Sequence, residues 1–169
     1  MGKVLLFMLA IVAFAGCSCI PVKNSTPMAN YHTLIVRNIN WNETAVIDIT
    51  GDQMKEYIAA QPRLAELFRA EFEKYIKMIS FFDKVVYGAV LADADTLILE
   101  PKIYTLKPGG FMPGASFTGL LITAGGRLVG NYTAERRLNQ NNGTNMLENI
   151  EKLVIELGED AASRLPYAR

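Results

Sequence analysis

The chain has 169 residues, of which half are hydrophobic and a fifth are charged, enough to close one hydrophobic core of ordinary size. Its 17 basic and 17 acidic side chains cancel and are interspersed, so the charge pattern excludes an electrostatic nucleic-acid binder. Residues 1–16 contain only Lys3 among the charged residues, so their removal leaves the remainder close to neutral.

The amino-terminal segment has the order of a secretion signal. Lys3 supplies one positive charge, residues 4–15 are uniformly apolar, and small residues follow. The apolar run is too short for a hydrocarbon core of ~30 Å, which needs about twenty helical residues. We therefore expect a cleaved signal rather than a permanent transmembrane helix.

The signal ends in Phe14, Ala15, Gly16 and Cys17, which resembles the lipobox of bacterial lipoproteins. Phe14 departs from the pattern, because Leu or another aliphatic residue is usual there. The resemblance implies recognition by lipoprotein signal peptidase at Phe14, Ala15 and Gly16, and attachment of acyl chains such as palmitate to Cys17. These chains would anchor the protein in a membrane. The alternatives are an ordinary signal with a coincidental cysteine, or a redox or metal role for Cys17 with Cys19.

The resemblance also suggests a location and a division of the chain. Ser18, directly after the lipidated cysteine, resembles the residue that directs bacterial lipoproteins to the outer membrane. The domain would then face the periplasm. We expect a signal peptide over residues 1–16, a lipidated flexible tether over 17–32, and a single domain over 33–169.

The first half of that domain shows strand signals followed by a helix signal. Alternating and β-branched residues predict strands over 33–41 and 45–50, with a break at Gly51. Apolar residues recurring every three or four positions predict an amphipathic helix over 62–80, with Pro62 in its first turn.

The second half adds strands and a closing helix. Strands are expected at residues 84–87, 96–106 and 117–137. Gly125 and Gly126 favour a hairpin turn within the last of these, which is expected to form two strands or one strongly bent strand. Asn145 with Glu148 predicts the start of a second helix. This order predicts an α+β fold, in which an antiparallel or mixed sheet is packed by two amphipathic helices.

Several of these features together resemble a known domain. A lipobox, the segments FDKVV at residues 82–86 and ADADTLIL at 92–99, a glycine-rich hairpin and a closing helix resemble small envelope lipoproteins similar to the amino-terminal domain of TolB. The resemblance spans residues 33–165. It implies a binding component of envelope assembly or transport, and no catalytic residue is carried over.

The residues themselves offer no catalytic constellation. His32 is the only histidine, so a catalytic triad or a site with several histidine ligands is excluded by counting. Asp93 and Asp95 are interpreted as turn-forming residues before a strand rather than as paired catalytic carboxylates. We expect no metal, no cofactor and no enzymatic activity.

One segment is hard to explain by packing alone. Residues 109–117 are rich in Gly and Pro, and they contain Phe111, Met112 and Phe117. Either these side chains fold back on the core, or they form a loop that contacts a partner or ligand. The sequence therefore favours a lipid-anchored, non-enzymatic binding or assembly component with a protein partner in the envelope. A binding module for a small apolar or lipidic ligand, with this loop as a lid, is the alternative.

Overall fold

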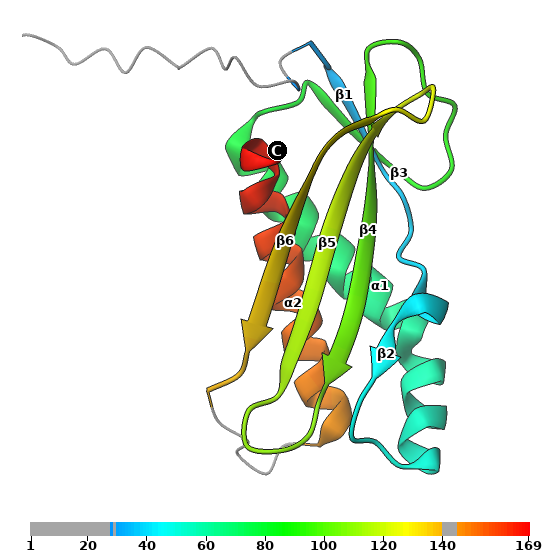
Figure 1. The fold of residues 1–169 in the computed structure, drawn as a ribbon, viewed down its shortest axis with the longest axis vertical. Helices are drawn as coiled ribbons and strands as arrows, with labels where there is room; N and C mark the ends of the chain where they lie inside the picture. The colour runs from blue at the N-terminus through cyan, green and yellow to red at the C-terminus, as the bar shows by residue number, and fades with distance from the viewer. Residues whose placement is uncertain (1–27, 29, 140–144) are drawn as a thin grey trace, which may run out of the picture.

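The computed structural model describes residue 28 and residues 30–139 and 145–169. Its elements are β1 (Thr33–Val36), η1 (Trp41–Glu43), β2 (Ala45–Val46), α1 (Gly51–Ile79), β3 (Lys84–Tyr87), β4 (Thr96–Lys107), β5 (Gly114–Thr123), β6 (Leu128–Arg137), α2 (Met146–Arg164) and η2 (Leu165–Tyr167). The sheet has the order β3-β1-β4-β5-β6, and β2 pairs with β4 at its far end. The fold is α+β with a mixed sheet and two helices, as the sequence predicts (Figure 1).

The mixed character of the sheet follows from its connections. β1 is parallel to β3, because α1 carries the chain from one end of the sheet back to the other, and it is parallel to β4, because the loop after β3 returns the chain to the same end. β4, β5 and β6 are joined directly and form an antiparallel meander. Gly126 has φ 78° in the turn between β5 and β6, which confirms the hairpin expected at Gly125 and Gly126.

The first helix begins at Gly51, eleven residues earlier than Pro62, so the expected helix start at Pro62 is wrong; the strand signal does end before Gly51, as predicted. The Thr50 side chain accepts from the Gln53 amide while the Gln53 side chain accepts from the Thr50 amide, so this capping box starts α1. Pro62 lies on the exposed side inside the helix. There, water can reach the carbonyl group of Ile58 that loses its helical partner.

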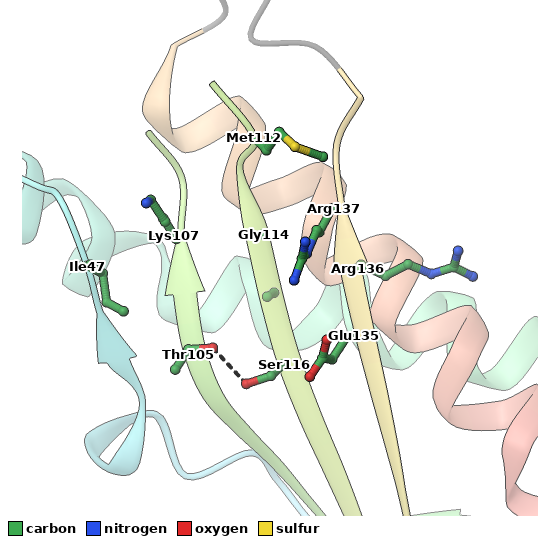
Figure 2. A pocket seen from close by; sticks show the side chains of 10 residues that line it. Ile47, Thr105, Lys107, Met112, Gly114, Ser116, Glu135, Arg136 and Arg137 are labelled. Carbon is green, nitrogen blue, oxygen red and sulfur yellow. Dashed lines mark hydrogen bonds between the residues drawn. The ribbon is translucent and has the colours of Figure 1, made fainter. Parts of the chain in front are cut away.

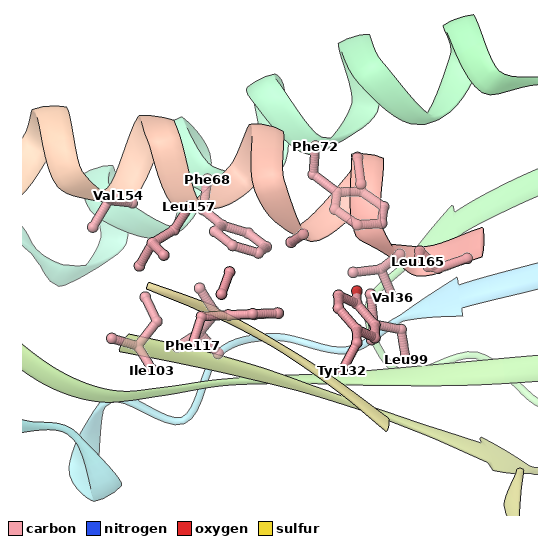
Figure 3. Packing of buried hydrophobic residues seen from close by; sticks show 14 of the residues in the cluster. Val36, Phe68, Phe72, Leu99, Ile103, Phe117, Tyr132, Val154, Leu157 and Leu165 are labelled. Carbon is pink, nitrogen blue, oxygen red and sulfur yellow. The ribbon is translucent and has the colours of Figure 1, made fainter. Parts of the chain in front are cut away.

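Both helices pack on the same face of the sheet and enclose the core (Figure 3). The apolar stripe of α1 comprises Tyr57, Ala60, Leu64, Phe68, Phe72 and Ile76. Phe68 lies against Phe117 of β5 with ring centroids 5.7 Å apart, and Phe117 lies against Tyr132 of β6 at 5.8 Å. The aromatic side chains thus join the helix layer to the middle of the sheet.

The folded domain begins before Thr33. Met28 is 1% exposed in the core, and the His32 amide donates to the Asp95 carbonyl at 3.1 Å. Residues 17–27 and residue 29 lie outside the described part of the chain, so the tether stays a prediction. None of the described helices has the length and hydrophobicity needed to span a membrane.

Candidate functional site

The face of the sheet opposite the helices carries the features from which a binding site can be built. In Figure 1 α1 and α2 lie behind the long strands β4, β5 and β6, and the other face of these strands is turned to the viewer. Side chains alternate between the two faces along a strand. On β4, Leu99 and Ile103 enter the core, whereas Glu100 and Lys102 belong to the opposite face. We call this second surface the open face.

One end of the open face is apolar. The strand register aligns Val86, Ile35, Ile98, Ile122 and Leu128 across five neighbouring strands, and we call them the apolar row. Ile35 and Ile98 are 1% and 4% exposed, although neither belongs to the core beneath the helices. Leu128, at the β6 edge, is 55% exposed. The row therefore becomes more accessible towards that edge.

The other end of the open face is polar and hollowed. A pocket of about 400 Å³ lies there, within the size range of small-ligand sites (Figure 2). It is lined by Ile47, Thr105, Lys107, Met112, Gly114, Ala115, Ser116, Glu135, Arg136 and Arg137. We call it the strand-end pocket, because it lies over the end of β4 and the start of β5.

Two hydroxyl groups form the middle of the strand-end pocket. Thr105 Oγ1 and Ser116 Oγ are 2.6 Å apart across β4 and β5. Gly114, next to them on β5, lies close to the neighbouring strand, because a Cβ there would be 3.2 Å from the Arg136 carbonyl oxygen, a tight contact. These groups can donate and accept hydrogen bonds. No histidine accompanies them in the lining, so no imidazole is present to activate either hydroxyl as a nucleophile.

Cationic groups flank the same pocket. Lys107 and Arg137 lie on either side of Gly114 in the strand register, as Figure 2 shows. The Lys107 ammonium pairs with Asp48 at 3.2 Å. Arg136 points the other way and donates from Nη2 to Oδ1 of the buried Asp160 on α2 at 2.5 Å. Glu135 lies opposite Ser116 and also lines the pocket, so acidic and basic groups are both present and the lining suits a polar group.

A second hollow of about 340 Å³ lies beside β4 on the open face. It includes Arg37 and Glu100, and the ion pair between Lys102 and Glu43. The hydrogen bond from the Lys102 ammonium, and then its charge, lower the pKa of Glu43. Both pockets and the apolar row therefore belong to one continuous side of the sheet.

The loop expected over residues 109–117 is shorter in the structure, because β5 already begins at Gly114. Phe111 is 88% exposed and Met112 is 42% exposed, and Met112 lines the strand-end pocket. Phe117 is 1% exposed on β5, so for this residue the first alternative, folding back on the core, is the one that the structure shows. Alternation along β5 turns Phe117 to the helices, where it packs against Phe68. Of the three, only Met112 contributes to the pocket.

The other residues singled out in the sequence lie away from the strand-end pocket or outside the part of the chain that the structure describes. Cys17 and the preceding lipobox residues are not among the described residues, so lipidation stays a prediction. His32 Nδ1 is 3.1 Å from Asp83 Oδ2, with both side chains exposed. Asp93 Oδ1 accepts from the Asp95 amide at 3.2 Å, the turn geometry that the sequence indicates. Within residues 28, 30–139 and 145–169, no group of three or more His, Cys, Asp or Glu could hold a metal ion.

The chain matches no known family model and no curated protein. Among solved structures, a Xanthomonas campestris protein of family DUF330 is similar, with 10% identity and a TM-score of 0.50 over 82% of this chain and 85% of that one. PelC from Paraburkholderia phytofirmans, a dodecamer, has 12% identity and a TM-score of 0.43 over 77% and 88%. A minor lipoprotein from Acinetobacter baumannii has 10% identity and a TM-score of 0.41 over 81% and 94%. At such identities the DUF330 protein shows a shared fold alone, and the resemblance to TolB stays an expectation.

Proposed function

We propose that the protein is a lipid-anchored component of the bacterial envelope, held by acyl chains on Cys17, that binds a protein partner through the open face. It acts in assembly or transport without catalysing a reaction, and it faces the periplasm from the outer membrane. The observation that carries the binding role is the open face itself. Among the described residues, the helices cover one side of the sheet, while the other side combines polar pockets with an apolar row that is exposed at Leu128.

Lipidation is tested on the native product. Intact-mass analysis and fatty-acid labelling are expected to show acyl chains on the wild type, and a chain that starts at Cys17. Cys17→Ala should lose the label and leave the membrane fraction, whereas the neighbouring control Cys19→Ala should keep both. An unmodified sulfur at Cys17, or a chain that retains Met1, would contradict the anchor.

The binding role is tested by site-specific photo-crosslinking in intact cells. A crosslinking amino acid at Thr118, in the middle of the open face, is expected to capture a discrete partner. The same group at the exposed Ala70 on α1 is the control for the helix side. Equal products from both positions, or none from Thr118, would count against the open face as the binding surface.

The strand-end pocket favours one second candidate, the binding of a small apolar or lipidic ligand. Ile47 and Met112 offer apolar contacts beside the Thr105 and Ser116 hydroxyls, a combination suited to a molecule with an apolar part and a polar head. Mass spectrometry of the gently purified protein should then detect a co-purified lipid. Ser116→Phe should displace this lipid by filling the pocket, and the control Thr133→Phe should retain it. Absence of lipid from the wild type would reject this candidate.

A further inference from the structure

Two loops at one end of the sheet expose large aliphatic side chains to solvent. Val90 and Leu91, in the loop between β3 and β4, are 43% and 98% exposed, and Leu128, after the β5–β6 turn, is 55% exposed. We call these three residues the apolar tip. Figure 1 shows both loops at the same end of the molecule as the start of β1. The structure thus presents apolar groups where the chain enters the domain.

Backbone contacts fix this arrangement. The His32 amide donates to the Asp95 carbonyl at 3.1 Å, which joins the start of β1 to the end of the β3–β4 loop. Met28 is buried in the core five residues before the first residue of β1. The chain from Cys17 to Met28 reaches at most ~40 Å when fully extended. An anchor at Cys17 would therefore hold this end of the domain within ~40 Å of the bilayer.

The charged side chains around the apolar tip do not favour docking on a strongly charged membrane. Lys84 and Arg127 are exposed at this end, and so are Asp83, Asp93 and Asp95. The basic side chains do not outnumber the acidic ones, so these charges give no long-range attraction to an anionic membrane. Transfer of the aliphatic side chains out of water is the remaining contribution, and it depends little on salt.

We propose that the apolar tip inserts into the lipid interface, so that the domain docks end-on against the bilayer. The proposal rests on the proposed anchor, because tethering raises the local concentration of the tip at the membrane and allows a weak contact to persist. Each leucine removed from water into lipid should shift the ratio of docked to undocked domain by about tenfold or more.

The test uses the full-length lipidated chain in vesicles of phosphatidylethanolamine and phosphatidylglycerol. An environment-sensitive fluorophore is attached at Ala89→Cys, an exposed position beside the tip, in a Cys19→Ser background. Lipids with a quencher on the acyl chain should quench it, and aqueous iodide should quench it poorly. High salt should leave this pattern unchanged.

Variants separate the tip from other exposed apolar groups. Leu91→Asp should lower the docked-to-undocked ratio by about tenfold, and adding Leu128→Asp by about hundredfold. If Leu128→Asp disturbs the fold, Leu91→Asp alone still tests the docking. The control Phe111→Asp replaces an 88% exposed residue in the β4–β5 loop, at the opposite end of the sheet, and should have no effect.

The outcomes distinguish docking from anchoring. Acylated, vesicle-bound protein whose label is quenched by iodide but not by lipid would overturn docking and leave the anchor intact. A label protected from both quenchers would also overturn it, because the tip would then be covered by protein. Absence of acylation at Cys17 in the same sample would identify failure of the anchor instead.

Discussion

Gly158→Ala should destabilise the protein, although alanine is the better helix former. Gly158 lies inside α2 where it crosses α1, and a Cβ there would lie 2.6 Å from the Phe68 carbonyl oxygen and 3.2 Å from the Glu71 Cβ. Because the nearest atom belongs to backbone, the helices must separate. Overpacking of this kind costs about 1–3 kcal/mol, whereas helix propensity returns at most about 1 kcal/mol. We expect a net loss of about 1–2 kcal/mol.

Urea unfolding followed by circular dichroism measures this loss directly. In thermal unfolding it corresponds to a decrease in Tm of roughly 2–8 °C for a chain of this size. The matched control is Gly51→Ala in the first turn of α1, where a Cβ would have nothing within 4 Å. A Gly158→Ala variant as stable as the wild type would refute the reasoning, because the crossing would then have room for a methyl group.

Three further changes can be followed in the same unfolding assay. Thr50→Ala should cost about 1 kcal/mol by removing the side-chain acceptor from the capping box of α1. Asp160→Ala should cost about 2 kcal/mol, because Arg136 loses its charged acceptor while remaining partly buried; an unchanged midpoint would show that water replaces it. Burial raises the pKa of Tyr132, so the folded state favours the neutral phenol, and the free energy of unfolding should fall as pH rises above about 10. Tyr132→Phe should weaken this pH dependence, and at neutral pH it should be neutral or stabilising, since the buried hydroxyl has no hydrogen-bond partner among the described residues.

Local signals explain which elements the sequence predicts well. Asn145 accepts from the Leu147 amide at 2.9 Å and begins α2 as expected, because a short polar side chain suits that position irrespective of the remaining fold. The turn at Gly125 and Gly126 depends equally on nearby residues, and the structure places Gly126 in the left-handed region. The order of strands and helices follows from such signals.

Competing signals explain where the sequence misleads. Pro62 suits a first turn, but the upstream Thr50 and Gln53 capping box is stronger, and Tyr57 and Ala60 gain burial by extending α1. Residues 45–50 alternate as a strand would, yet only two of them pair with β4. Strand pairing depends on the neighbouring strand, which is distant in the sequence, and a local pattern does not contain that information.

The open face could be predicted only in part. Alternation along β4 assigns Leu99 and Ile103 to the core, and an unbroken period of two would also place Thr105 there. The register shift between Ile103 and Thr105 reverses the alternation of side chains between the two faces of the sheet. Leu106 is therefore buried, and Thr105 meets Ser116 on the open face. A bulge of this kind depends on the partner strand, so the hydroxyl pair is not evident from the sequence.

The distance between the two ends of the open face bears on which partner the protein binds. Ile98 of the apolar row and Lys107 of the strand-end pocket are separated by nine residues of β4, or about 30 Å at strand spacing. If the apolar tip docks on the bilayer, the pocket stands well away from it in the aqueous space. A protein partner can reach it there directly, whereas a lipid must first leave the membrane. Lipid found in the pocket of a docked protein would therefore identify a carrier, and a pocket without lipid that crosslinks to protein would identify an adaptor.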